Sequence, residues 1–178
     1  MNKIDFLNLL RVNTNAIVVC TGGEPLLQNI SVLFGSVTKS DEREFHVETN
    51  GTIRPDLPFT YTVPGGPLLE KKPFPFSVIK SIKWVVSPKI DNELCDYTYW
   101  RKLPNVCMKF IITNEEELNK VDGIVSQYRL NRKKVYVGIK GTTRTSQYNT
   151  RLVDAILSRE YNYSPRLHIL LWGNRPGR

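Results

Sequence analysis

Six short apolar, β-branched runs alternate along the chain with segments of helical periodicity, and this alternation constrains the fold more than any other feature. We expect strands at Ala16–Cys20, Phe45–Thr49, Ser81–Val86, Val106–Thr113, Lys134–Ile139 and Arg166–Trp172. We expect helices over residues 2–11, Pro25–Phe34, Glu115–Tyr128 and Asn149–Glu160. Strands that alternate with helices form a mostly parallel sheet, so the predicted class is α/β.

The length of 178 residues suits a single domain with a sizeable core. The proline-rich segment Pro55–Lys80 interrupts the alternation, and we interpret it as a long irregular loop. No run approaches the roughly 18 apolar residues of a membrane span, and the first residues do not resemble a signal peptide. Three widely spaced cysteines argue against a disulfide scaffold, so a cytoplasmic protein is expected.

The net charge is +8, from 25 basic and 17 acidic residues. A positive field attracts polyanions, so nucleic acid is one candidate partner, and small anionic substrates would explain the charge equally well. The densest basic group is Arg129, Arg132, Lys133 and Lys134, which is either a solvated turn before a strand or a phosphate-binding patch. A nucleic-acid-binding module is the weakest interpretation because it rests on charge alone.

Polar, turn-forming clusters follow three successive predicted strands. They are Thr21–Pro25, Glu48–Thr52 and Ser87–Lys89. Parallel α/β sheets bind ligands at the carboxyl ends of their strands. Gly22 and Gly23 allow a close backbone approach to a ligand, and Glu24 suits an ammonium group. We therefore predict a binding site where these clusters meet.

These motifs carry a family resemblance. Thr21–Pro25 resembles the S-adenosylmethionine-binding motif of radical SAM enzymes. Together with Glu48–Gly51, Trp84–Lys89 and Arg166–Gly173, it resembles the 7-carboxy-7-deazaguanine synthase family from about residue 16 onward. The resemblance implies a radical SAM lyase with a [4Fe–4S] cluster and an assisting magnesium ion. Such enzymes convert 6-carboxy-5,6,7,8-tetrahydropterin to 7-carboxy-7-deazaguanine, a precursor of queuosine and related bases.

The resemblance also assigns roles to residues. The predicted S-adenosylmethionine contacts are Gly22, Gly23, Glu24, Glu48, Asn50, Gly51, Ser87 and Lys89. The predicted contacts to the pterin substrate are Thr21 and His168. The resemblance assigns no catalytic residue and no metal ligand in this chain. The other histidine, His46, is expected to be structural.

The chain departs from the family in its cysteines. Radical SAM enzymes hold their cluster with a Cys-x3-Cys-x2-Cys loop, and this sequence has none. Cys20, Cys95 and Cys107 are expected to be small buried apolar residues. The family's first strand and magnesium segment are also unmatched. Residues 1–178 are therefore predicted to form one incomplete radical SAM-like domain, a partial β/α barrel without its first strand and cluster loop.

Three interpretations follow from this departure. In the first, the chain is a deazaguanine synthase whose cluster segment lies upstream or on a partner chain, and it is inactive alone. In the second, it is a cluster-free remnant that binds S-adenosylmethionine, a pterin or a partner protein, with homodimers as one arrangement across an open barrel edge. In the third, which matches the closing motif less well, it activates a glycyl-radical partner.

Overall fold

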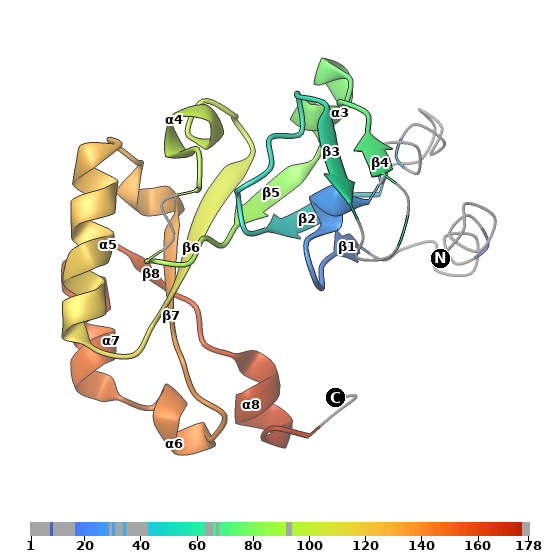
Figure 1. Cartoon of the computed structure of the whole chain (residues 1–178). Helices are drawn as coiled ribbons and strands as arrows, with labels where there is room; N and C mark the ends of the chain where they lie inside the picture. The colour runs from blue at the N-terminus through green and yellow to red at the C-terminus, as the bar shows by residue number, and fades with distance from the viewer. Residues whose placement is uncertain are drawn as a thin grey trace.

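A computed structural model of the chain describes residues 8, 17–28, 30, 34, 43–62, 66, 68–91 and 94–175. A six-stranded sheet runs through it in the order β1-β2-β5-β6-β7-β8 (Figure 1). The strands are β1 Val18–Cys20, β2 Phe45–Thr49, β5 Lys83–Val86, β6 Val106–Ile112, β7 Val135–Ile139 and β8 Asn162–Tyr163. Every pair of neighbours is parallel, which confirms the predicted α/β class with a parallel sheet. The first five predicted strands are confirmed to within two residues at each end.

The helices connect these strands. They are η1 Pro25–Leu27, α3 Phe76–Ser81, α4 Tyr97–Trp100, α5 Glu115–Gln127, η2 Arg132–Lys134, α6 Arg144–Gln147, α7 Thr150–Ser158 and α8 Leu167–Trp172. The Asn114 side chain caps α5 by accepting from Glu117 N at 2.9 Å, and Asn149 caps α7 in the same way. Both helices were predicted. None of the described helices is long and apolar enough to cross a membrane.

Two other predicted helices lie partly or mostly outside the described residues. Of residues 2–11 the structure describes only Asn8, which is helical. The segment that begins at Pro25 opens as a 3-10 helix, and its described members Ile30 and Phe34 are helical and buried. The predicted starting point at Pro25 is therefore confirmed.

The two faces of the sheet differ sharply. Side chains alternate between the faces along each strand, and residues paired between parallel strands share a face. One face carries Val47, Trp84 and Phe110, each at most 1% exposed, and α5 and α7 pack on it (Figure 1). We call it the covered face. The other, the open face, carries the partly exposed Glu48 and Lys109.

The predicted strand at Arg166–Trp172 is wrong: residues Leu167–Trp172 form helix α8. The last strand is instead Asn162–Tyr163, which pairs with β7. The ladder ends where Ser164 N donates to Val137 O at 2.9 Å, because the next residue is Pro165, which has no N–H. A six-residue apolar run does not distinguish a strand from a helix by its pattern.

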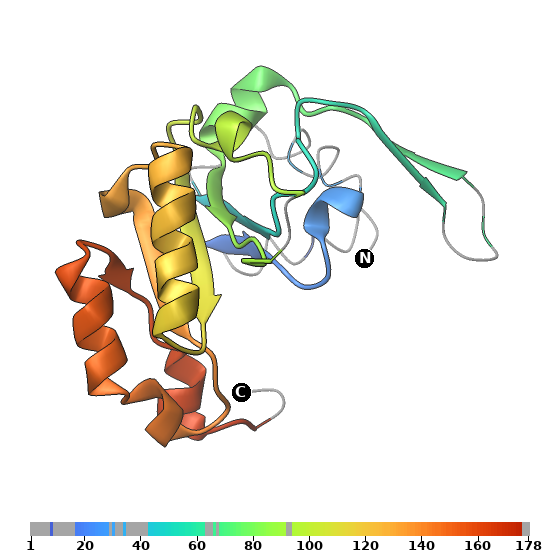
Figure 2. The same ribbon diagram turned by 60° about the vertical axis from the view of Figure 1, so that its left-hand side comes forward.

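The predicted loop at Pro55–Lys80 is also wrong. It contains an antiparallel hairpin, β3 Phe59–Thr62 and β4 Leu68–Lys71, followed by α3. Figure 2 shows the hairpin as an arm that extends from the body of the protein. Lys71 anchors its base, since its Nζ donates to the carbonyl oxygens of Arg54, Pro55 and Leu57 at 3.1–3.3 Å. The lysine is 1% exposed, and burial lowers the pKa of its ammonium group to about 8.

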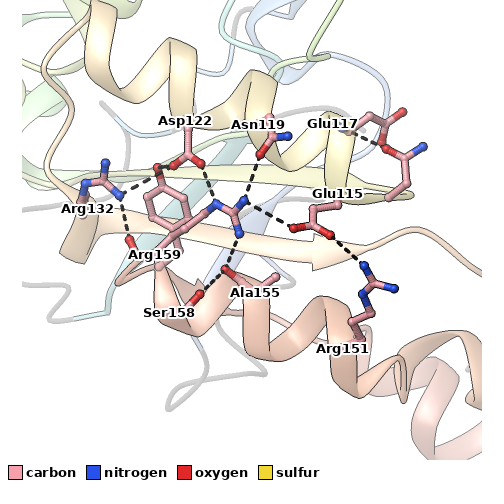
Figure 3. Close-up of polar contacts among 11 residues, drawn as sticks. Glu115, Glu117, Asn119, Asp122, Arg132, Arg151, Ala155, Ser158 and Arg159 are labelled. Carbon is pink, nitrogen blue, oxygen red and sulfur yellow. Dashed lines mark hydrogen bonds and ion pairs between the residues drawn. The ribbon is translucent and has the colours of Figure 1, made fainter.

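A polar network joins α5 to the end of α7 (Figure 3). Asp122 accepts from Arg159 Nε at 2.7 Å and from Tyr161 OH at 2.6 Å. Arg159 also donates to Asn119 Oδ1 at 2.9 Å and to Ala155 O at 2.9 Å. Burial and the bond to Asp122 raise the pKa of the Tyr161 phenol. The network fixes α7 against α5 on the covered side of the sheet.

Candidate functional site

The loop after β1 is shaped for a close backbone approach. Gly22 has φ of 86° and Gly23 has φ of 55°, a left-handed region that favours glycine. A Cβ atom placed on either residue would meet no atom of the described residues within 4 Å. Among the described residues, the glycines therefore leave space on the side of the loop where a Cβ would point. We call Thr21–Glu24 the glycine loop.

Glu24 ties the glycine loop to the loop after β2. Its Oε1 accepts from Leu26 N at 3.0 Å and from Thr49 Oγ1 at 2.7 Å, and its Oε2 accepts from Asn50 N at 2.8 Å. A carboxylate has about four acceptor positions, and three are used here, so about one is left for the ammonium group of a ligand. In this structure Glu24 holds two loops together, a contact that the sequence pattern did not indicate.

Asn50 and Gly51 form the turn after β2. Asn50 Oδ1 accepts from Thr52 N at 2.9 Å and from Thr52 Oγ1 at 2.7 Å. Gly51 is buried with φ of 80°, and a Cβ there would lie 2.7 Å from Cys95 Sγ. Its carbonyl accepts from Trp100 Nε1 at 2.9 Å. The structure thus gives both residues a role in shaping the turn.

Glu48 is the centre of the polar contacts on the open face. Its Oε1 lies 3.0 Å from Lys109 Nζ on β6, and its Oε2 accepts from Thr21 Oγ1 at 3.4 Å. The Glu48 and Lys109 side chains are each about one-third exposed. Lys109 was not predicted from the sequence. The sequence does contain one indication of it, because Lys109 is the only charged residue in the apolar run Val106–Ile112.

A cleft opens where β2, β5 and β6 end, with a volume of about 410 Å³. It is lined by Glu48, Ser87, Lys109, Ile111, Pro165, Arg166, Leu167 and His168. Three of these residues, Glu48, Ser87 and His168, were predicted for the site. His168 reaches the cleft from the first turn of α8 and not from a strand. Arg166, also unassigned from sequence, donates from Nη1 to Gly141 O at 2.7 Å.

The structure therefore divides the predicted site residues into two groups. Gly22, Gly23, Glu24, Asn50 and Gly51 build the loops after β1 and β2, whereas Glu48, Ser87 and His168 line the cleft. The bond from Thr21 to Glu48 joins the two groups. Lys89 is exposed and does not line the cleft.

The cysteines do not form a metal centre. Cys20 lies on β1, Cys95 just before α4 and Cys107 on β6, and all three are free thiols. Burial raises the pKa of Cys95 to about 12 and also raises the pKa of Cys20 and Cys107, which disfavours the thiolate that binds metals. Within the described ranges no group of three or more His, Cys, Asp or Glu side chains could hold a metal ion. These residues fit neither an iron–sulfur cluster nor a magnesium site.

Comparison with known proteins gives two relatives with the same name. No family model matches the chain. A 7-carboxy-7-deazaguanine synthase of Halobacterium salinarum is 26% identical over 178 aligned positions, covering 89% of this chain and 66% of that protein. One of Pyrobaculum aerophilum is 26% identical over 98 positions, covering 52% of this chain and 44% of that protein. The chain thus spans less than two thirds of the length of either relative. It is a distant homologue of the 7-carboxy-7-deazaguanine synthases.

Proposed function

We propose that the glycine loop and the cleft bind the two organic ligands of a 7-carboxy-7-deazaguanine synthase. These ligands are S-adenosylmethionine and 6-carboxy-5,6,7,8-tetrahydropterin. The observation that carries the proposal is the row Thr21–Glu48–Lys109, which links the glycine loop to the cleft. The two ligands must meet for the family's reaction, and contacts that run from the glycine loop to the cleft support this assignment.

The chemistry of each group suits one ligand. The space beside Gly22 and Gly23 suits the methionyl end of S-adenosylmethionine, which could then approach the backbone closely. Lys109 and Arg166 supply positive charge to the cleft, and the substrate pterin bears a carboxylate. Glu48 accepts hydrogen bonds, as the amino groups of a pterin require. His168 and Ser87 add further polar contacts in the same cleft.

We propose that the 178-residue chain binds these ligands and does not turn them over by itself. The family's reaction begins with reductive cleavage of S-adenosylmethionine at an iron–sulfur cluster. Because the three cysteines lie on separate elements and burial raises the pKa of each thiol, they are not arranged as a set of cluster ligands. With a cluster segment from elsewhere, its product would be 7-carboxy-7-deazaguanine for queuosine-type bases.

A second candidate function is binding without chemistry. The same cysteine positions favour it, since a cluster-free remnant can keep the glycine loop and the cleft while it has no thiolate ligands. Such a protein would sequester S-adenosylmethionine or a pterin, or would present the cleft to a partner chain. Sequencing the native transcript upstream of Met1 separates the two functions. A Cys-x3-Cys-x2-Cys segment in frame or on a neighbouring chain favours the enzyme.

Calorimetric titration tests the ligands. We expect the chain to bind S-adenosylmethionine and, under anaerobic conditions, the carboxytetrahydropterin. Glu48→Gln should weaken pterin binding about tenfold, because a charged hydrogen-bond partner is lost. Glu44→Gln is the matched control, since Glu44 bonds His46 and Lys83 away from the cleft. Equal losses in both variants, or no binding of either ligand, would contradict the proposal.

Reconstitution with iron and sulfide tests the absence of turnover. The chain alone should form no 5′-deoxyadenosine from S-adenosylmethionine in the presence of a strong reductant. Measurable 5′-deoxyadenosine that depends on Cys20, Cys95 or Cys107 would overturn this part of the proposal. The binding experiment would be unaffected by that result.

A further inference from the structure

A basic pocket lies at the end of the sheet opposite the cleft. Figures 1 and 2 show α4 and the end of α5 at one end of the molecule and α8 at the other. The pocket has a volume of about 280 Å³ and shares no lining residue with the cleft. Its charged residues are Arg101, Lys102, Arg129 and Lys134, and no carboxylate lines it. We call these residues the basic pocket.

The basic pocket carries a local excess of positive charge. None of its four cations forms an ion pair with a carboxylate in the described part of the chain. Arg101 Nη1 donates to Tyr128 O at 3.3 Å and Lys134 Nζ donates to Pro104 O at 2.7 Å. These bonds use neutral acceptors and leave several donors on each side chain.

The floor of the pocket is apolar. Val106, Met108 and Leu130 line it, and each of these side chains is less than 9% exposed. A ligand that fits must therefore combine an apolar surface with strong negative charge. A phosphate group accepts bidentate hydrogen bonds from arginine and attracts lysine as a point charge, so an organic phosphate has both properties.

Arg129 occupies a backbone position that favours glycine. It follows α5 with φ of 51°, and it is one of two non-glycine residues with positive φ in the described structure. Arg129 N donates to Ser126 O at 3.2 Å and Leu130 N donates to Val125 O at 2.9 Å, the pattern of a Schellman motif. Glycine is the usual residue at this position because it carries no steric penalty there. The chain has an arginine where the backbone favours glycine.

We propose that the basic pocket binds the phosphate group of an organic phosphate, with the apolar part of the ligand on Val106, Met108 and Leu130. The phosphate can come from a free nucleotide or from a nucleic acid strand. A neighbouring hollow shares Arg101 and Arg129 with the pocket, and a second shares Lys134, so a longer ligand has room to continue. The site is separate from the proposed function and stands without it.

Titration with pyrophosphate, ADP and a short oligouridine at low salt tests the proposal. The decisive variant is Arg129→Gly, which removes the charge and places glycine in its favoured conformation. We expect this variant to melt at the same or a higher temperature than the parent. It should nevertheless bind ADP or oligouridine about tenfold more weakly, as for loss of one charge-assisted bond. Lys102→Ala should give a similar loss.

Arg151→Ala is the matched control, since Arg151 is 91% exposed on α7 and does not line the pocket. Its affinity for each probe should equal that of the parent. Binding of ADP and pyrophosphate that depends on Arg129 identifies a nucleotide site. Binding of oligouridine alone with the same dependence identifies a nucleic acid strand. No binding of any probe, or equal losses in Arg129→Gly and Arg151→Ala, overturns the proposal.

Discussion

The two faces of the sheet show how one set of strands serves two purposes. On the covered face Val47, Trp84 and Phe110 are at most 1% exposed and belong to the hydrophobic core. On the open face Glu48 and Lys109 remain one-third exposed and pair with each other. Parallel sheets are commonly buried on both faces. Here the fold is held from one side, which leaves the other side free to carry polar chemistry.

The largest effect should come from a cavity on the covered face. Phe110→Ala removes a side chain that is 0% exposed, so we expect a loss of about 3–5 kcal/mol in the free energy of unfolding. Ile111→Ala, one residue along the same strand, removes an open-face side chain and should cost under about 2 kcal/mol. Urea denaturation measures both variants. Equal costs would remove the distinction between the faces.

Two glycines sharpen the comparison at the strand ends. Gly51→Ala forces a Cβ to within 2.7 Å of Val86 Cγ1 at a positive φ, and should cost about 2–4 kcal/mol. Gly23→Ala meets open space and should cost only about 1 kcal/mol from its conformation. Thermal unfolding gives the stabilities. A smaller loss of stability in Gly51→Ala than in Gly23→Ala would contradict the close packing around the turn at Gly51.

Buried Lys71 and partly exposed Lys109 should differ in how they affect the pH dependence of stability. The pKa of buried Lys71 is lowered to about 8 from 10.5, so the unfolded chain holds more protons between these values. Folding therefore releases a proton there, and the free energy of unfolding should gain a rising contribution as the pH increases from about 8 to about 10. Lys71→Met should remove this contribution from urea midpoints measured across that range. Lys109→Met should leave it in place, and the opposite assignment would contradict the burial of Lys71.

The smallest effect on stability should come from the open-face ion pair. Lys109→Met breaks a contact between two partly exposed groups, which is worth less than about 1 kcal/mol. The same variant should weaken binding of the carboxytetrahydropterin, because the cleft loses a positive charge. Paired denaturation and titration experiments separate these effects. A large loss of stability without a change in affinity would assign Lys109 to the fold alone.

Local patterns predicted most of the covered face. Strand β6 is an apolar run, and helix α5 combines the Asn114 cap with apolar residues on one side. These signals lie within a few neighbouring residues, so the sequence contains them directly. The prediction of a strand at α8 was wrong because its short apolar run is compatible with either a helix or a strand. The hairpin was not predicted because its segment is rich in proline, and the Lys71 contacts at its base join residues 14–17 positions apart.

The candidate site was predicted less completely, for a physical reason. Thr21, Glu48, Ser87 and His168 were predicted for the site because they belong to the strand-end clusters or the family motifs, and the structure places them in or beside the cleft. Lys109 and Arg166 were missed because their part in the site depends on tertiary contacts across the sheet. The bonds from Thr49 and Asn50 to Glu24 connect residues more than twenty positions apart, and no local pattern indicates them.

The buried amine of Lys71 allows local opening of the hairpin to be measured by chemical labelling. With the side chain 1% exposed and its Nζ bonded to three carbonyl groups, an amine-acylating reagent cannot reach it while the hairpin is closed. Labelling then proceeds only through transient detachment of the arm. The labelling rate of Lys71, set against that of exposed Lys89 in the same sample, gives the population of the detached state. Mass spectrometry of the native protein can therefore measure how firmly the arm is attached, without any substitution.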